Sequence, residues 1–572
     1  MSRARLAVNS LLGIWLFLTG CAGTGPAAPA PIAEAVSQTR PLVILGSVEP
    51  AGLALRALTT RGASLSTVKI FNALPALTDS QGGTRPELLA SLPVLGTETW
   101  QVFADGTMQT SYSLRPNLTW HDSEPLIGDD FVFAWQVYSS PELPFANEPP
   151  WAVISDVAAP DRDHFVIHWK VPYPNAAQLN QVNNELTALP RHILGAAFDQ
   201  MATAGRDSLT NHPFWGPQYV GLGPYRVQEW ERGSFINAVR FEGYALGVPK
   251  IARIDLRFSA DQNVVVATLL AGEAQIATDS SIGQAVAAAL EQEWARTEAG
   301  TVLYAPGSWR ATKFQLRPDL ANPGAVLDAR VRKAMGYAVD KDTINDAAYR
   351  GKGILTDTPI WTGSVLGAAI DDSIRHFALD LRATDQLLNE AGFSKGPDGF
   401  YSGLGGRLPF ELTTTGSPQS LQDILIMTDG FRSAGLDVQQ RSLPAAQQQD
   451  GQARSTFPAM FTSSNAMGET ALTDLESSQI PTANNRWVGR NIGGWSSADY
   501  DRLLQSFRTT LDTNSRILIL RQALRVYSDE VPVISLVFPP GVTAYVAGLK
   551  NAFGKTRTGS NDFWNVYEWE FE

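Results

Sequence analysis

Ser66-Thr67-Val68-Lys69 is the short motif in this sequence that most resembles catalytic machinery. It has the S-x-x-K spacing in which a lysine one helical turn away activates a serine nucleophile for acyl transfer. That chemistry needs companion motifs, but Lys555-Thr556 is followed by Arg557, and Ser560-Asn561-Asp562 has the wrong order. A four-residue pattern alone arises by chance, so it does not predict an acyltransferase.

Two further patterns suggest metal or nucleotide chemistry and fail on spacing. His164 and His168 share one face of an expected strand over residues 164–171, but a four-residue spacing suits metal ligation from a helix. Five residues separate Gly548 from Gly554, where a P-loop needs four. The sequence contains no G-x-S-x-G and no H-E-x-x-H. We therefore predict that the chain is not an enzyme and holds no metal or cofactor.

Cys21 is the only cysteine, so the chain has no disulfide framework and no cysteine-based metal site. Arg3 and Arg5 precede an apolar run over residues 6–18, which has the length of a signal sequence and is too short to span a bilayer. The run ends in Leu18-Thr19-Gly20-Cys21, which resembles a bacterial lipobox. The resemblance implies cleavage before Cys21 and lipidation of its sulfur. The alternative is an ordinary secretory signal with a chance cysteine.

Residues 22–40 are dominated by Ala, Gly and Pro, a composition typical of a flexible tether. The whole chain carries a net charge of −12, and loss of Arg3 and Arg5 with the signal makes it more negative. An acidic chain is a poor nucleic-acid binder. We predict an extracytoplasmic, monomeric protein, periplasmic or at the cell surface, anchored to the membrane through Cys21 without binding nucleic acid.

The remaining chain alternates strands and helices, which predicts an α/β fold. In the first half, the pattern predicts a strand over 251–258, a helix over 263–271 and a strand over 275–277. In the second half, it predicts strands over 313–316, 409–415 and 436–441, with helices over 329–339 and 383–391. Asp340 is expected to cap another helix that runs to Tyr349.

Several segments that lie in the expected turns, caps and strands occur together in a fixed order. They are Tyr112–Asp122, Asp129–Trp135, Gly221–Tyr225, Arg240–Tyr244, Gly272–Ala277, Asp328–Lys341, Leu387–Phe393 and Asn491–Trp495. Taken in order, they resemble the family 5 extracytoplasmic solute-binding proteins of ABC importers, which include oligopeptide, dipeptide and nickel-complex binders. The resemblance covers nearly the whole chain after the tether. It implies transport of a captured solute, with an ABC permease and ATPase as partners.

The resemblance also implies a two-lobed periplasmic-binding-protein-like fold, with a hinged cleft and an extra subdomain on the first lobe. Residues 1–20 would form the signal peptide and residues 21–40 the lipidated cysteine and tether. The first lobe would comprise 41–70, 221–305 and 530–572, the extra subdomain 71–220, and the second lobe 306–529. The hinge would lie near Ala305-Pro306 and Val531-Pro532. Closure of such a hinge around a ligand is how the family signals occupancy to the importer.

By position in the resemblance, ligand contacts are expected from both lobes. Peptide-binding members pair an extended ligand with their own backbone. The candidates here are Phe71, Asn72, Trp309, Trp361, Phe461, Thr462, Ser463, Asn485, Trp487 and Asn491. Core packing is the alternative role for each aromatic residue, and a turn or cap is the alternative for each asparagine.

The ligand class stays open at this point. Many peptide binders of the family carry an aspartate that pairs with the peptide amino group, and the segment Phe461–Gly468 lacks it. A peptide is the family's usual ligand, while a sugar or another polar solute stacked on Trp fits the Asn and Trp content equally well. The remaining alternative is a ligand-sensing or chaperone-like lipoprotein built on the same fold.

Overall fold

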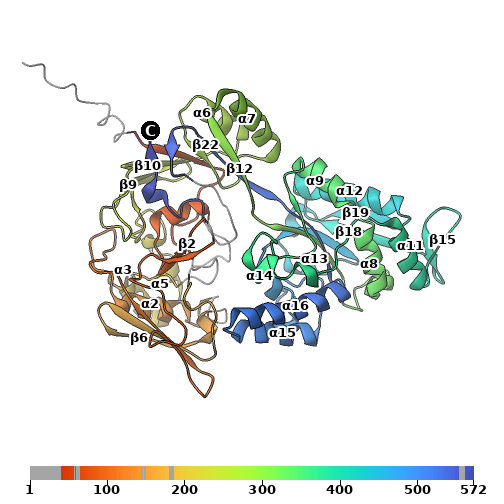
Figure 1. Cartoon of the computed structure of the whole chain (residues 1–572), viewed down its shortest axis with the longest axis horizontal. Helices are drawn as coiled ribbons and strands as arrows, with labels where there is room; N and C mark the ends of the chain where they lie inside the picture. Colours follow the sequence, from red (N-terminus) through yellow and green to blue (C-terminus); the bar gives the residue numbers. More distant parts are fainter. Residues whose placement is uncertain are drawn as a thin grey trace, which may run out of the picture.

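The structure is a computed structural model that describes residues 40–56, 58, 65–80, 82–143, 146, 150–179, 186–552 and 561–572. The chain forms two α/β lobes that lie side by side (Figure 1). None of the helices in the described part is both long and apolar enough to cross a bilayer. The expected signal peptide, Cys21 and the tether up to residue 39 lie outside the described residues.

The first lobe is built on a seven-stranded mixed sheet. Its order is β12 (Gly300–Pro306), β22 (Pro540–Val546), β11 (Ile276–Ala277), β1 (Leu42–Gly46), β10 (Arg253–Phe258), β9 (Phe235–Arg240) and β8 (Tyr225–Glu231). The inner strand β1 reads LVILG and is buried on both faces, as expected for a strand with parallel neighbours covered on each side. The predicted strand–helix–strand unit is confirmed as β10, α6 (Gln262–Leu270) and β11.

The second lobe is built on a six-stranded sheet. Its order is β14 (Ile354–Leu355), β21 (Val533–Phe538), β13 (Trp309–Phe314), β20 (Met460–Asn465), β18 (Pro409–Thr414) and β19 (Asp437–Ser442). Helices pack on both faces, and separate hydrophobic clusters lie on the two sides of the sheet. The predicted strand over 313–316 is confirmed only in part, because β13 begins earlier, at Trp309, and ends at Phe314.

The chain crosses between the two sheets twice. Residues 307–308 join β12 to β13, and Pro539 joins β21 to β22. The amide of Gly307 donates to the carbonyl of Pro539 at 3.2 Å, so the two crossings run side by side. The first crossing agrees with the predicted one. The second was predicted too early, because Val531-Pro532 precedes β21, and β21 pairs with β13 of the second sheet.

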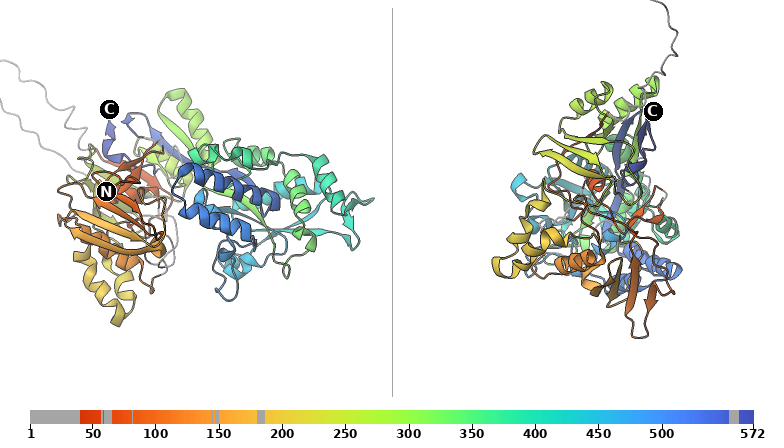
Figure 2. Two further views of the ribbon diagram at one scale, coloured as in Figure 1. Left: turned by 60° about the horizontal axis from the view of Figure 1, so that its bottom comes forward. Right: turned by 90° about the vertical axis from the view of Figure 1, so that its left-hand side faces the viewer.

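The segment predicted as the extra subdomain carries its own four-stranded sheet, in the order β4 (Trp100–Val102), β5 (Met108–Ser113), β7 (His164–Trp169) and β6 (Ile154–Asp161). Helix α2 (Gly128–Tyr138) packs on β6 and β7. A single hydrophobic cluster runs from Leu42 and Ile44 of the first sheet to Phe131 and Phe165 of this subdomain. The continuous core ties the subdomain to the first lobe, and the ribbon of the subdomain lies beside that of the first lobe in Figure 2.

The remaining elements cover the sheets or connect them. The helices are α3 (Arg191–Asp199), α4 (Met201–Ala204), α5 (Asp207–Thr210), α7 (Gln284–Thr297), α8 (Ala329–Tyr337), α9 (Lys341–Tyr349), α10 (Val365–Ala368), α11 (Leu381–Glu390), α12 (Pro418–Ser433), α13 (Gly451–Ser455), α14 (Glu469–Thr473), α15 (Ala498–Thr509) and α16 (Thr513–Glu530). Short strands are β2 (Ala76–Thr78), β3 (Thr84–Pro86), β15 (Ser394–Lys395), β16 (Tyr401–Gly403), β17 (Gly406–Arg407), β23 (Leu549–Lys550) and β24 (Glu570–Phe571). Asp340 caps α9 as predicted, because its carboxylate accepts from the amide of Thr343 at 2.9 Å.

Candidate functional site

The carboxyl ends of the parallel strands identify where the two lobes can share a ligand. In the first sheet, β1, β10, β11 and β12 run in one direction, and β12 ends at the first crossing. In the second sheet, β18, β19, β20 and β21 run in one direction, and β21 ends at the return crossing. Both sheets therefore turn their carboxyl ends toward the crossings. Ligands of open α/β sheets bind outside these ends.

On the first lobe, this edge is occupied by contacts that hold the fold together. Asp279 follows β11, and its carboxylate accepts from the amide of Ser66 at 2.9 Å and from the hydroxyl of Thr67 at 3.0 Å. It thereby anchors the start of the 3₁₀ helix η1 (Ser66–Phe71). Lys69, the lysine of the S-x-x-K pattern, pairs instead with Glu87 at 2.7 Å. Both ends of the S-x-x-K pattern thus serve the fold.

Phe71 and Asn72 end η1 and are both buried. The Phe71 carbonyl accepts from the amide of Gly223 at 3.1 Å, an approach so close that a Cβ on Gly223 would lie 2.2 Å from the Asn72 nitrogen. The Asn72 amide donates to the carbonyls of Leu53 and Val68 at 2.7 and 2.8 Å, and its oxygen accepts from Tyr219. In this conformation neither side chain offers a free polar group to a ligand.

Strand β20 carries the candidates Phe461, Thr462 and Ser463. It lies between β13 and β18, and the register with β18 ends at Thr462. The backbone of Phe461 and Thr462 is therefore occupied on both sides, which argues against strand addition there. Among the described residues, Ser463 and the two residues after it have a strand neighbour on one side only, so the edge that can pair with an extended ligand begins at Ser463.

Trp309 and Trp361 belong to the apolar cluster on one face of the second sheet. Trp309 opens β13 opposite Asn465 and is buried, and its indole N–H has no hydrogen-bond partner in the described part of the chain. Trp361 is half-buried at the margin of the same cluster. Trp309 thus keeps a free donor at the carboxyl edge, whereas Trp361 contributes mainly apolar surface.

Residues 474–495 form a long connection, here called the late loop, that contains the candidates Asn485, Trp487 and Asn491. Asn491 is buried, and its amide donates to the carbonyls of Leu475, Glu476 and Trp495 at 2.7–3.1 Å, while its oxygen accepts from the Trp495 amide. These four bonds use the side chain of Asn491 to hold the two ends of the late loop together, which is a structural role.

The other two late-loop candidates are more accessible. Asn485 is exposed, and its side chain closes a turn by bonding the amide of Thr482 and the carbonyl of Ile480, each at 2.8 Å. Trp487 is half-buried with a φ of 60°, and its carbonyl packs against Gly451 at the start of α13. These positions support the shape of the loop, and only the Trp487 ring is placed to add contact area.

Four charged residues beside β20 belong to no sequence motif and were not predicted. Lys313 lies on β13, and its register partner is Phe461. Arg454 comes from α13, and Asp474 and Arg490 come from the late loop. Burial lowers the pKa of Lys313 to about 8, with Asp474 raising it and Arg454 and Arg490 lowering it. Burial also raises the pKa of Asp474, and Lys313 and Arg490 oppose that shift. The four groups, here called the Lys313 cluster, therefore lie close enough to act on one another's charge.

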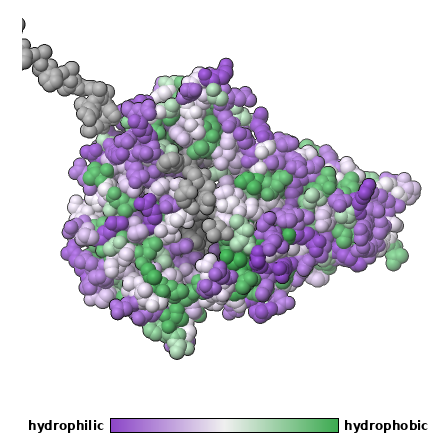
Figure 3. Space-filling view, viewed as in Figure 1, coloured by the Kyte–Doolittle hydropathy of each residue, from purple (hydrophilic) through white to green (hydrophobic). Residues whose placement is uncertain are grey.

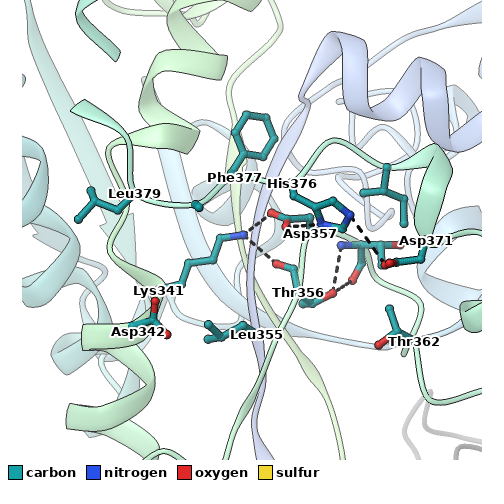
Figure 4. A pocket seen from close by; sticks show the side chains of 13 residues that line it. Lys341, Asp342, Leu355, Thr356, Asp357, Thr362, Asp371, His376, Phe377 and Leu379 are labelled. Atoms are coloured by element: carbon teal, nitrogen blue, oxygen red, sulfur yellow. Dashed lines mark hydrogen bonds and ion pairs between the residues drawn. The ribbon is translucent and has the colours of Figure 1, made fainter. Parts of the chain in front are cut away.

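Two cavities lie apart from all of these candidates. One of about 320 Å³ in the second lobe is lined by Lys341, Asp357, Asp371, His376 and neighbours (Figure 4). Lys341 donates to the Thr356 carbonyl at 2.9 Å and pairs with Asp357, while His376 lies 3.3 Å from Asp357. The other, of about 640 Å³, lies between Leu270, Trp294 and Phe571 in the first lobe.

Metal ligation finds no support in the part of the chain that is described, where His, Cys, Asp and Glu form no group of three suited to an ion. His164 and His168 lie on β7, and each faces a different aspartate, Asp161 at 2.7 Å and Asp156 at 3.6 Å. Cys21 lies outside the described residues, so its lipidation stays a prediction.

Comparison with known proteins gives the context for this geometry. The chain is 20% identical over 99% of its length to the oligopeptide-binding protein AppA of Bacillus subtilis, covering 98% of that protein. It is 24% identical over 77% of its length to the dipeptide-binding protein of Escherichia coli, covering 81% of it. NikZ of Campylobacter jejuni, solved with Ni(L-His), has the same fold with a TM-score of 0.71 at 22% identity, covering 93% of this chain and 99% of NikZ.

The fold comparison confirms the predicted two-lobed α/β architecture of periplasmic binding proteins. The model for the middle part of one family matches residues 92–485, which is more than half of the chain. This match agrees with the ordered motifs and with the paired carboxyl edges of the two sheets. The chain belongs to the bacterial extracellular solute-binding proteins, family 5.

Proposed function

We propose that this protein is the substrate-binding component of an ABC importer, which captures a peptide or similar small polar solute between its lobes and delivers it to the permease. The observation that carries the proposal is the pair of carboxyl edges turned toward two adjacent crossings, joined by the bond from Gly307 to Pro539. Two short crossings of this kind form a hinge, because few backbone dihedrals need to change for one lobe to rotate on the other.

The ligand would stabilise the closed arrangement by binding it more tightly than the open one. Contacts are expected from the free edge of β20 at Ser463, from Trp309 with its unpaired N–H, and from the Trp487 ring of the late loop. Phe71, Asn72 and Asn491 would support this surface from behind. No turnover of the solute is expected. Cys21 would hold the protein at the membrane beside the permease.

Ligand capture is tested by native mass spectrometry of the purified protein, followed by thermal melting with whatever solute co-purifies. A ligand at one hundred times its Kd adds about 2.7 kcal/mol of stability, which raises Tm by several degrees. Stimulation of the cognate permease–ATPase by the loaded protein then distinguishes transport from sensing. If peptides and sugars at millimolar concentration leave Tm unchanged, the proposal fails.

A further inference from the structure

Lys313 differs from the other buried lysines of the protein. Three lysines in the described residues are buried: Lys69, Lys313 and Lys341. Lys69 pairs with Glu87 and Lys341 with Asp357. Lys313 is only 6% exposed, and its ammonium has a single acceptor among the described residues, the carbonyl of Arg490 at 3.1 Å. Two of its three donors are therefore unused, although a buried ammonium needs compensation.

The two arginines that lower the pKa of Lys313 also have side chains without a hydrogen-bond or ion-pair partner among the described residues. The guanidinium of Arg454 makes no hydrogen bond or ion pair with any described residue, and its Nε is fully enclosed. Burial lowers the pKa of Arg454, and the charge of Arg490 lowers it further. Arg490 is exposed, and its side chain likewise has no partner in the described part of the chain. By contrast, the buried Arg310 pairs with Asp423, and the buried Arg332 bonds four carbonyls.

Asp474 does not neutralise this group. Its carboxylate influences the pKa of Lys313, yet no nitrogen of Lys313, Arg454 or Arg490 lies within the 4.0 Å of an ion pair. Three cations and one separated carboxylate give the cluster an excess of two positive charges. Among the described residues, the buried Lys69, Arg310 and Lys341 are ion-paired and the buried Arg332 bonds four carbonyls. The unused donors of the Lys313 cluster are therefore available to a group from outside the chain.

The position of the cluster makes it accessible to a captured solute. Lys313 and Ser463 lie on the same face of neighbouring strands, since their register partners are Phe461 and Ala311. Helix α14, which immediately precedes Asp474, lies at the margin of the second lobe that faces the first lobe (Figure 1). Helix α13 lies farther from the first lobe. On the face in Figure 3, hydrophilic residues dominate the outer end of the second lobe and apolar patches gather toward the middle. Arg490 contacts the buried ammonium of Lys313 through its carbonyl and is itself exposed to solvent.

The loop that carries Arg490 is held firmly, as a binding surface requires. Asn491 clasps it through the four bonds described above. Arg317 donates to the carbonyls of Pro481 and Ile492 at 2.9 and 2.7 Å, which fastens both ends of the exposed stretch. The carbonyl of Arg490 is thereby kept against Lys313, and the charge of Arg490 lowers the pKa of both Lys313 and Arg454.

From these contacts we propose that Lys313, Arg454 and Arg490 form an anion subsite that receives a carboxylate or phosphate group of the captured solute. The inference rests on the proposed capture function and adds to it a ligand class. Charge-assisted bonds from an ammonium and a planar guanidinium suit an oxyanion with several acceptor oxygens. A neutral sugar would leave the three cationic side chains without a counter-charge.

The test uses the mature chain and three probes in calorimetry: trialanine, trialanine with an amidated carboxyl terminus, and inorganic phosphate. We expect trialanine or phosphate to bind, and the amidated peptide to bind at least about tenfold more weakly than the free acid. Preference for trialanine identifies a carboxylate ligand, and preference for phosphate identifies a phosphorylated one. The variant R490Q, which changes an exposed residue and preserves the core, should lower the affinity for the anionic probe about tenfold. K313M should lower it by a similar factor.

R502Q removes the same charge from an exposed arginine of α15 that pairs with Asp499 and is the matched control, with unchanged affinity expected. Equal binding of the free and amidated peptides, or full affinity in R490Q, overturns the anion subsite. So does a wild-type protein that responds to neither anionic probe. The co-purified solute tests capture separately: if it still raises Tm in wild type and in R490Q alike, the receptor function stands without this subsite.

Discussion

Lys341 and Lys313 are two buried lysines of the same lobe in opposite electrostatic situations. Lys341 lies against the cavity of Figure 4, where its ammonium donates hydrogen bonds to the Asp357 carboxylate and the Thr356 carbonyl, and His376 contacts the Asp357 carboxylate. Lys313 lies under the late loop, with one carbonyl and a distant Asp474. Both ammonium groups are therefore buried, and they differ in whether hydrogen-bond acceptors and a counter-charge compensate them. A satisfied buried charge is part of the fold, whereas an unsatisfied one is available for function.

Removal of the Lys341 partner should have the largest effect. Asp357→Asn leaves Lys341 buried without a counter-charge, and such a change costs about 3 kcal/mol of unfolding free energy. Urea denaturation measures it, with Arg407→Gln on the exposed surface of the same lobe as the control. A loss below about 0.5 kcal/mol, the size of a surface effect, would show that the Lys341 pair is not the stabilising contact described here.

Asn491 should come next. Asn491→Ala removes four buried hydrogen bonds and takes the Asn491 donor away from the carbonyls of Leu475 and Trp495, while the Glu476 carbonyl keeps the amide of Gln479. We expect a cost of about 2.5 kcal/mol. Because the same residue fixes the late loop, proteolysis at 474–495 should become faster. Asn485→Ala, in the exposed turn of the same loop, is the control. Equal effects of the two changes would contradict the distinction between clasp and turn.

Lys313→Met should stabilise the ligand-free protein by about 2 kcal/mol, since an apolar side chain of similar length replaces an uncompensated buried charge. Lys341→Met is the matched variant, and it should destabilise the protein because it leaves the Asp357 carboxylate with His376 as its remaining partner. Thermal unfolding of both in ligand-free protein compares them directly. Destabilisation by Lys313→Met would mean that the ammonium is satisfied within the fold.

The pH dependence should follow from the same residue with a smaller effect. The folded pKa of Lys313, about 8, lies below its unfolded value of 10.5, so the unfolded state binds the proton more tightly. Stability therefore rises with pH above about 8, by about 1.4 kcal/mol at pH 9, and the gain is complete near 10.5. The difference between wild type and Lys313→Met should shrink over that range. A constant difference from pH 7 to pH 9 would contradict the low pKa.

The sequence predicted much of the architecture because the relevant signals are local. The alternating pattern over residues 251–258, which forms β10, and the cap at Asp340 each act within a few residues. The sequence placed the return crossing too early, because Val531-Pro532 looks like a break and only the pairing of β21 with β13 shows which sheet the next strand joins.

The candidate site was harder to predict, because its contacts join distant segments. Asn72 is occupied by Leu53, Val68 and Tyr219, and no local pattern indicates those partners. From the sequence, Lys313 looks like the solvent-facing residue of an alternating strand. In the structure the late loop, which begins about 160 residues further on, covers that face. Arg454 and Arg490 gain meaning only from the same packing, since neither belongs to a motif.

The distance between the lobes tests capture by closure most directly. Cys21 is the sole native cysteine, so Cys21→Ala with Val264→Cys on α6 and Leu421→Cys on α12 places one label on an exposed position of each lobe. We predict that the co-purified solute shortens the label distance in double electron–electron resonance, and that R490Q needs more solute for the same change. A distance that stays fixed while calorimetry shows saturated binding would contradict capture between the lobes.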